Sequence, residues 1–151
     1  MKKIIILAAT VLLMLSACTK EPSSTLEQTT WQYSTEISNI QYNFYLVLSS
    51  PTHGYAIIYE SPKNSSSGSI YQVYDVRYTF DGEESGTIRF RKEYGVGNNT
   101  SQTNINNYTD TITTSFYTYA GNNKMLVHDT PNKLLRNIEL TAYNPYSLTN
   151  K

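Results

Sequence analysis

Cys18 is the only thiol in the chain, and it follows a segment that resembles no part of a folded domain. Lys2 and Lys3 precede an apolar stretch of 12 residues from Ile4 to Leu15, and two small residues separate that stretch from the cysteine. A basic start, an apolar core of about 7–15 residues and small residues before a cleavage site make a secretory signal. A membrane-spanning helix needs about 20 residues. The stretch therefore predicts export rather than a permanent span.

The tetrapeptide Leu15-Ser16-Ala17-Cys18 resembles the lipobox of bacterial lipoproteins. In that family the thiol receives a diacylglycerol, the chain is cut before the cysteine, and the new amine is acylated. The resemblance implies an anchor on Cys18 whose burial contributes about 0.8 kcal/mol per CH₂ group. Thr19 stands where an Asp commonly retains Gram-negative lipoproteins at the inner membrane, which implies the outer membrane. The alternative is an ordinary cleaved signal in which the cysteine has no role.

Catalytic patterns are not visible in the rest of the sequence. His53 and His128 lie 75 residues apart and lack metal-ligand spacing, and there is no nucleophile elbow, phosphate loop or dinucleotide fingerprint. Glu60, Asp75 and Arg77 are expected on outward faces of strands. A reversed strand phase would place these groups inside the domain, where a buried carboxylate is a functional candidate. The sequence thus predicts a protein that is not an enzyme and has no metal or cofactor.

Cleavage before Cys18 would leave 134 residues, with 10 basic and 12 acidic side chains. This length is enough for one domain with a single core. We expect a signal peptide over residues 1–17, a lipidated tether over 18–25, one domain over 26–146 and a tail over 147–151. A net charge near −2 gives no reason to expect nucleic acid as a partner.

All 14 tyrosines follow Cys18, and apolar residues alternate with polar ones at period two almost throughout. Tyrosine and threonine favour pleated, half-buried surfaces. Alternation and turn signals predict eight strands. Their ranges are 26–35, 38–48, 55–60, 70–80, 86–94, 107–120, 124–128 and 135–143.

Short strands joined by hairpin-length turns favour an all-β, antiparallel sheet. Closing such a sheet removes the edges that promote aggregation, and eight strands make a barrel that is filled by side chains or holds one small ligand. We therefore expect a single eight-stranded up-and-down barrel, with a β-sandwich as the alternative.

This layout, from Leu26 to Tyr143, resembles the lipocalin-like, or calycin-like, barrels of small bacterial lipoproteins. Lipocalins carry a Gly-x-Trp in the first strand, and here Thr29 stands in place of the glycine before Trp31. An arginine near the end of the last lipocalin strand lies across that tryptophan. Arg136 is the candidate here, although it lies early in its strand, and a cation–π contact would contribute about 0.5–2 kcal/mol.

Aromatic residues are the candidate lining of a ligand cavity, because flat rings with hydroxyl tips bury area and still form hydrogen bonds. The candidates are Trp31, Tyr42, Phe44, Tyr55, Tyr59, Tyr74, Tyr78, Phe90 and Phe116. The leading hypothesis is a membrane-anchored lipoprotein, non-enzymatic, that binds a small hydrophobic or amphipathic ligand in its barrel. The alternative is an envelope scaffold or inhibitor that contacts a partner protein through the long loops Ser61–Ser69 and Gly95–Asn106.

Overall fold

The structure is a computed structural model that describes residues 26, 29–63, 70–93, 107–119, 121 and 123–143. The predicted signal peptide, the tether with Cys18 and the C-terminal tail lie outside these residues, as do the whole of the loop 95–106 and residues 64–69 of the other long loop. Eight strands are present: β1 (Thr29–Ile37), β2 (Ile40–Leu48), β3 (His53–Pro62), β4 (Ile70–Phe80), β5 (Ser85–Lys92), β6 (Thr111–Tyr119), β7 (Lys124–Asp129) and β8 (Arg136–Tyr143).

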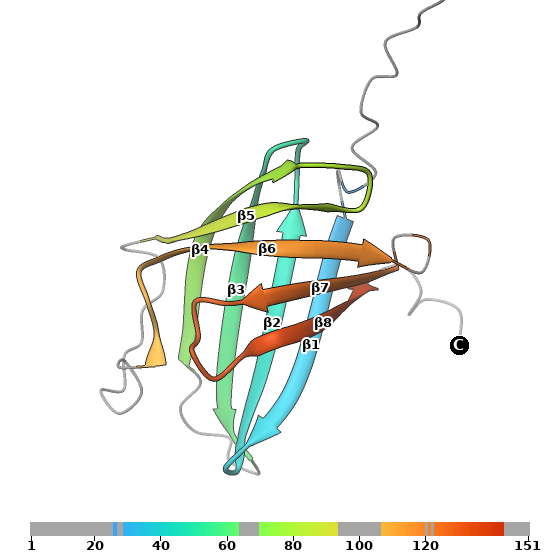
Figure 1. Ribbon diagram of the computed structural model, residues 1–151. Helices are drawn as coiled ribbons and strands as arrows, with labels where there is room; N and C mark the ends of the chain where they lie inside the picture. The colour runs from blue at the N-terminus through green and yellow to red at the C-terminus, as the bar shows by residue number, and fades with distance from the viewer. Residues whose placement is uncertain are drawn as a thin grey trace, which may run out of the picture.

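Each strand pairs antiparallel with the next, and β8 returns to pair with β1 (Figure 1). The chain is therefore a closed, eight-stranded, up-and-down barrel, as the sequence predicts, and the sandwich alternative is wrong. No helix in the described part of the chain is long and apolar enough to cross a membrane.

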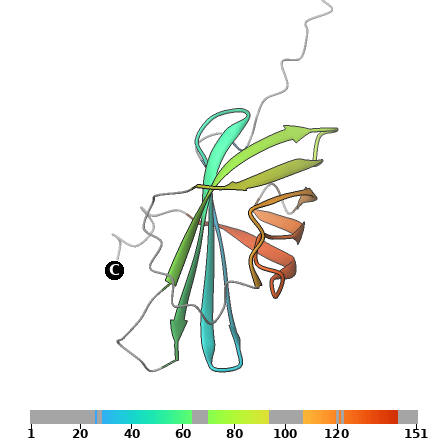
Figure 2. The same cartoon turned by 90° about the vertical axis from the view of Figure 1, so that its left-hand side faces the viewer.

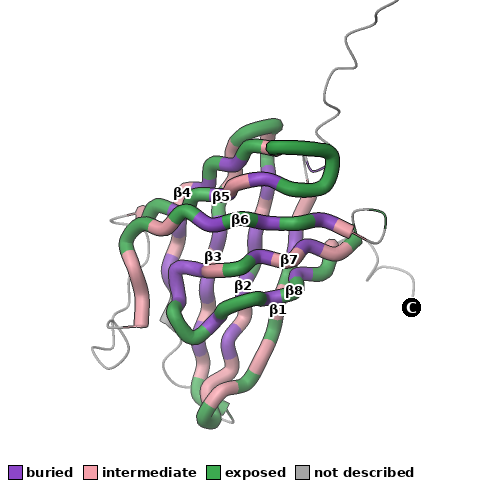
Figure 3. The backbone as a smooth tube through the Cα atoms, in the orientation of Figure 1, coloured by how far each residue is buried: buried purple, intermediate pink, exposed green. Residues whose placement is uncertain are grey.

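Burial alternates along the strands as period two requires (Figure 3). In β2 the inward residues Tyr42, Phe44, Leu46 and Leu48 are buried, while Tyr45 between them is exposed. The same pattern holds in β5, where Ile88 and Phe90 point inward. Strand phase therefore decides which residues reach the interior, and a one-residue slip would expose the whole buried set.

The first hairpin differs from the sequence prediction by two residues. β1 continues to Ile37 and β2 begins at Ile40, so the turn consists of Ser38 and Asn39. Both have positive φ, 51° and 64°, as a two-residue type I′ turn requires. Asparagine tolerates this conformation better than most residues, and the turn twists in the same sense as the strands that it joins.

Aromatic rings meet across the middle of the barrel. The centroids of Phe44 on β2 and Phe90 on β5 lie 6.0 Å apart with the rings nearly perpendicular, although β3 and β4 separate these strands in the sheet. Phe116 on β6 similarly contacts Tyr78 and Phe80 of β4, with centroids 6.5 Å and 5.2 Å away. Edge-to-face rings at these distances pack favourably. The interior around Phe44 and Phe90, and the interior next to the β4–β5 turn, are thus occupied by the protein's own side chains.

The two ends of the barrel carry different connections (Figures 1 and 2). One end holds the beginning of β1 and the turns β2–β3 and β4–β5; we call it the Thr29 end. The opposite end, the Ser38 end, holds the first hairpin, the close of β3 and the turn β7–β8. Because the chain enters the barrel at Thr29, the preceding segment with Cys18 joins the domain at the Thr29 end.

Candidate functional site

A buried carboxylate lies inside the barrel near the Ser38 end. Glu60, on β3, is 3% exposed and stands directly opposite Tyr42 of β2. The Tyr108 hydroxyl donates a hydrogen bond to Glu60 Oε1, and Asn132 Nδ2 donates another at 3.3 Å. A buried charge needs such partners because it has lost its water.

Two segments outside the strands bring these donors to Glu60. Tyr108 and Asn132 form an isolated antiparallel bridge. Backbone hydrogen bonds of 2.9 Å from Thr109 N to Pro131 O and of 2.8 Å from Lys133 N to Asn107 O support this bridge. The segment before β6 therefore pairs with the turn between β7 and β8. The sequence prediction that β6 begins at residue 107 is wrong, because Asn107–Asp110 precede the strand and pair with this turn instead.

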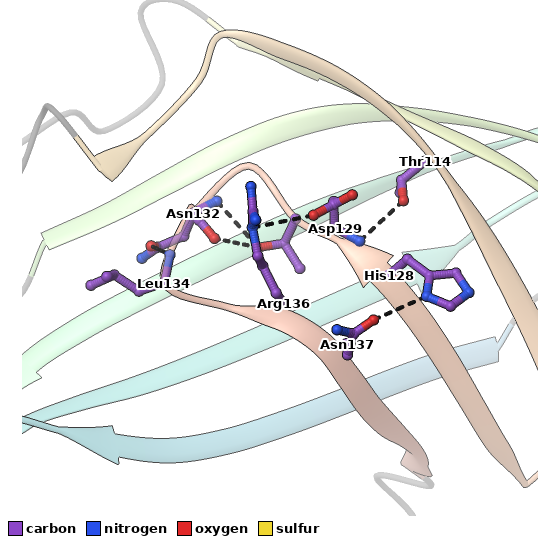
Figure 4. A network of polar contacts seen from close by, with 8 residues as sticks. Thr114, His128, Asp129, Asn132, Leu134, Arg136 and Asn137 are labelled. Carbon is purple, nitrogen blue, oxygen red and sulfur yellow. Dashed lines mark hydrogen bonds and ion pairs between the residues drawn. The ribbon is translucent and has the colours of Figure 1, made fainter.

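The turn is held by its own polar side chains (Figure 4). Asn132 Oδ1 accepts the Leu134 N–H at 2.9 Å, and the Thr130 hydroxyl bonds the Asn132 carbonyl at 2.9 Å. The Asp129 N–H donates to Thr114 Oγ1 at 3.0 Å, which ties the turn to β6. Thr130 and Asn132 are both buried. The turn thus presents the Asn132 amide to Glu60 in a fixed orientation.

Gln72 adds a second buried acceptor. It points inward from β4, is 3% exposed, and its Oε1 has no hydrogen-bond partner. It pairs with Ile58, two residues from Glu60 on the adjacent strand. Such diagonal neighbours on one face lie about 7–8 Å apart. An unsatisfied buried amide oxygen costs about 1–3 kcal/mol, so Gln72 marks the place in this cluster where a donor would be most favourable.

The electrostatics of the cluster keep its phenols protonated. Burial raises the pKa of Tyr108, and the hydrogen bond to Glu60 and the charge of Glu60 raise it further. Burial, followed by the charge of Glu60, also raises the pKa of Tyr42. The Tyr108 hydroxyl therefore acts as a hydrogen-bond donor to Glu60 rather than as a base, and the Tyr42 hydroxyl keeps its proton. The described residues contain no group of three or more His, Cys, Asp or Glu side chains that could hold a metal ion.

Seven of the nine predicted lining residues are inside the barrel. They are Trp31, Tyr42, Phe44, Tyr74, Tyr78, Phe90 and Phe116, and all are buried. Tyr55 and Tyr59 instead lie on the outer face, and Tyr55 is 44% exposed.

The phase predicted for β3 is therefore wrong. Ala56, Ile58 and Glu60 point inward, opposite the inward residues of β2. The β3 sequence is apolar on both faces, so its alternation does not determine the phase. Packing does, because small Ala56 fits between Leu46 and the large Tyr74 ring.

The predicted stacking of Arg136 on Trp31 is also wrong. The Arg136 side chain is 69% exposed, and its Nε lies 3.4 Å from Asp129 Oδ1 (Figure 4). Trp31 is fully buried, donates from Nε1 to Thr29 Oγ1 at 2.9 Å, and pairs across the sheet with Ala142. Six residues of strand separate Arg136 from Ala142, a distance of about 20 Å, which places the guanidinium at the other end of the barrel.

Three members of the Glu60 cluster were missed at the sequence level: Gln72, Tyr108 and Asn132. Gln72 carries a detectable signal, because it occupies an inward position between Ile70 and Tyr74 in an otherwise apolar alternation. Tyr108 and Asn132 lie outside the strands, and no pattern in the sequence indicates that their segments pair with each other. The other chemical candidates are apart from the cluster: His128 bonds Asn137 at 3.0 Å and is exposed, and Asp75 faces outward as predicted.

Comparisons with protein-family models, with curated proteins and with solved structures found no match for this chain.

Proposed function

We propose that this protein is a lipid-anchored protein of the bacterial outer membrane, held through Cys18, and that its barrel is a non-enzymatic binding module. The sequence Leu15-Ser16-Ala17-Cys18 supports the anchor through its resemblance to a lipobox. The β-barrel is a rigid scaffold that gives binding surfaces defined positions. A relationship of the barrel to the lipocalin-like barrels of bacterial lipoproteins is also part of this proposal.

Contact between Phe44 and Phe90 across the lumen is the observation that favours action through the outer surface. A hydrophobic ligand at mid-barrel would have to displace these rings, which are fully buried. Binding to a partner outside the barrel requires no such rearrangement. The first candidate function is therefore the envelope scaffold or inhibitor, acting on a partner protein.

The Glu60 cluster supports a second candidate, the binding of a small amphipathic ligand at the Ser38 end. Gln72 Oε1 is buried without a partner, and Glu60 lies on the next strand. A ligand that carries an N–H or O–H donor would satisfy Gln72, while its apolar part would lie against Tyr42 and Tyr74. In this second candidate the small ligand would bind near the mouth of the barrel rather than at its centre.

Probe binding distinguishes the two candidates. We expect the wild-type protein to leave the fluorescence of 8-anilinonaphthalene-1-sulfonate and of a fluorescent fatty acid unchanged. Phe44→Ala should bind the probes, because loss of the ring opens apolar space in the lumen. Stoichiometric binding by the wild type that Gln72→Leu weakens would overturn the first candidate and support the second.

The anchor has its own test. Mass spectrometry of the protein purified from bacterial membranes should find acyl chains on an N-terminal Cys18, and Cys18→Ser should leave the membrane fraction. An unmodified Cys18 in the membrane-bound wild type would refute the anchor.

A further inference from the structure

Three basic side chains form a row across the outside of the sheet. His53 on β3 stands opposite Arg77 on β4, and Arg77 stands opposite Arg89 on β5. We call His53, Arg77 and Arg89 the basic row. The row is close to the Thr29 end, because His53 is the first residue of β3.

The charges of the two arginines in the row are only partly compensated. Asp75 is shared by Arg77, whose Nε lies 3.8 Å from it, and by Arg91, whose Nη2 lies 3.6 Å away. Arg91 also contacts Glu93 at 3.8 Å. Arg89 forms no ion pair with any described residue. Like charges directly opposite each other on a sheet are unfavourable, so an anion beside Arg77 and Arg89 would relieve a repulsion that the fold leaves in place.

Hydroxyl groups surround the same position. An open hollow of about 340 Å³ is bordered by the basic row and by Thr52, Thr79 and Thr87. Guanidinium groups recognise the oxygens of phosphate through paired N–H donors, and the Thr79 hydroxyl adds a further donor. The other two hydroxyls have partners, because Thr87 donates to Asp81 at 3.3 Å and Thr52 Oγ1 is hydrogen-bonded to His53 Nδ1 at 2.6 Å. The donor set therefore fits a phosphate group.

The neighbouring surface fits the boundary of a bilayer. Tyr55 and Val47 face outward beside the row, opposite one another, and Tyr45 lies further along β2. Tyr45 and Tyr55 are among the few exposed large apolar side chains of the described residues, at 36% and 44% exposure. Tyrosine is enriched at membrane–water interfaces because its ring is apolar and its hydroxyl is polar. The chain that leads back to Cys18 also joins the domain at this end.

We propose that the basic row and Thr79 bind the phosphate of an anionic phospholipid and hold the Thr29 end of the barrel, on its β3–β5 side, against the membrane. Only the source of the phosphate depends on the proposed lipid anchor. The tether brings the row within reach of headgroups, whereas the recognition of phosphate rests on the side chains themselves.

Vesicle binding by the full chain carrying Cys18→Ser tests the proposal without the contribution of acyl chains. We expect it to bind vesicles of phosphatidylcholine mixed with phosphatidylglycerol, to ignore phosphatidylcholine alone, and to lose binding as salt rises. Arg77→Gln and Arg89→Gln should each weaken binding about fivefold, and the double variant roughly 25-fold. Arg136→Gln is the matched control, because Arg136 is exposed but is paired with Asp129 near the other end.

Equal binding to both kinds of vesicle, or an unchanged affinity in the double variant, would overturn the proposal. Inorganic phosphate is titrated in parallel by NMR. Loss of phosphate binding in the double variant without any preference for phosphatidylglycerol would assign the site to free phosphate and refute membrane docking. Because the arginines repel each other, the double variant should be at least as resistant to urea as the wild type. Suppose that mass spectrometry finds Cys18 unmodified in the wild type, while the Cys18→Ser protein still binds anionic vesicles. The lipid anchor would then be refuted, and the inference about the basic row would stand.

Discussion

Glu60 connects two segments that are far from it in the sequence. It accepts hydrogen bonds from Tyr108, which precedes β6, and from Asn132, in the turn before β8. Each donor removes part of the cost of burying a carboxylate. The barrel end near Glu60 is therefore held partly by hydrogen bonds to one charge, unlike the ring-filled centre.

Tyr108→Phe tests how much one such hydrogen bond contributes to the free energy of unfolding. The variant keeps the ring but leaves Glu60 short of a donor, and we expect the free energy of unfolding to fall by about 1–3 kcal/mol in urea. Tyr117→Phe is the matched control, because Tyr117 donates to Glu84 on the exposed surface at 2.8 Å. That variant should be indistinguishable from the wild type. Equal effects in the two variants would show that burial of the pair is unimportant.

The raised pKa of Tyr108 predicts that the free energy of unfolding depends on pH in the alkaline range. In the unfolded chain Tyr108 loses its proton near its ordinary pKa of 10.0, whereas burial and Glu60 raise its pKa in the folded protein. Above pH 10 the folded state therefore binds more protons than the unfolded state, and stability falls as pH rises. The contribution is complete below pH 10 and declines above it by up to about 1.4 kcal/mol per pH unit. The difference in unfolding free energy between wild type and Tyr108→Phe should be constant below pH 10 and shrink above it. A constant difference throughout would contradict this pKa direction.

At the level of strands, the sequence was informative where one face is clearly apolar. The inward residues Tyr42 and Phe44 of β2 and Phe90 of β5 were correctly predicted, as was the number of strands. The inward face of β3 was not, because Tyr55, Ile57 and Tyr59 form as apolar a set as Ala56 and Ile58. Only pairing with β2 decides between the two sets, and pairing is not local information. The same limit explains the missed cluster, because Tyr108 and Asn132 meet Glu60 through contacts 48 and 72 residues apart in sequence.

Gly86 shows how closely β5 packs against its neighbours. A Cβ at this position would lie 2.1 Å from the Thr79 carbonyl oxygen and 2.7 Å from the Phe116 ring. We expect Gly86→Ala to lower the free energy of unfolding by about 1–3 kcal/mol, because the backbone and the ring must both move. In the β4–β5 turn, Gly82→Ala meets only Ser85 Oγ, at 3.6 Å, and should change stability by less than about 0.5 kcal/mol. Thermal unfolding of both variants compares them, and an unaffected Gly86→Ala would show that the strands separate more easily than described.

For the whole molecule, the proposed anchor and the barrel together give the two ends different surroundings. The Thr29 end, with the basic row, is nearest to the segment that carries Cys18. The Ser38 end is at the opposite side of the barrel, and it holds Glu60, near the close of β3, and Gln72, near the start of β4. If the anchor and the membrane docking both hold, the Glu60 cluster points away from the bilayer. A ligand for that cluster would then arrive from the aqueous side.

The barrel closes where β1 pairs with β8, and this seam is the shortest pairing between neighbouring strands. β1 pairs with β2 over nine residue pairs but with β8 over three, from Thr30–Tyr143 to Gln32–Thr141. Few hydrogen bonds hold this seam, so local opening should begin there. Gln32 and Thr141 are opposite each other and exposed. Opposed residues in an antiparallel pair have Cα atoms about 4.5–5.5 Å apart, which suits a disulfide.

Gln32→Cys with Thr141→Cys, in a Cys18→Ser background, should therefore form a disulfide and close the seam covalently. The bond encloses most of the domain, and we expect the oxidised protein to be about 2–4 kcal/mol more stable than the same protein after reduction. Amide hydrogen exchange at Thr30 and Gln32 should slow by more than exchange at the β1–β2 turn. The reduced double variant is its own control, because the two forms share every side chain. Equal stability of the oxidised and reduced forms would mean that opening of the barrel begins elsewhere than between β1 and β8.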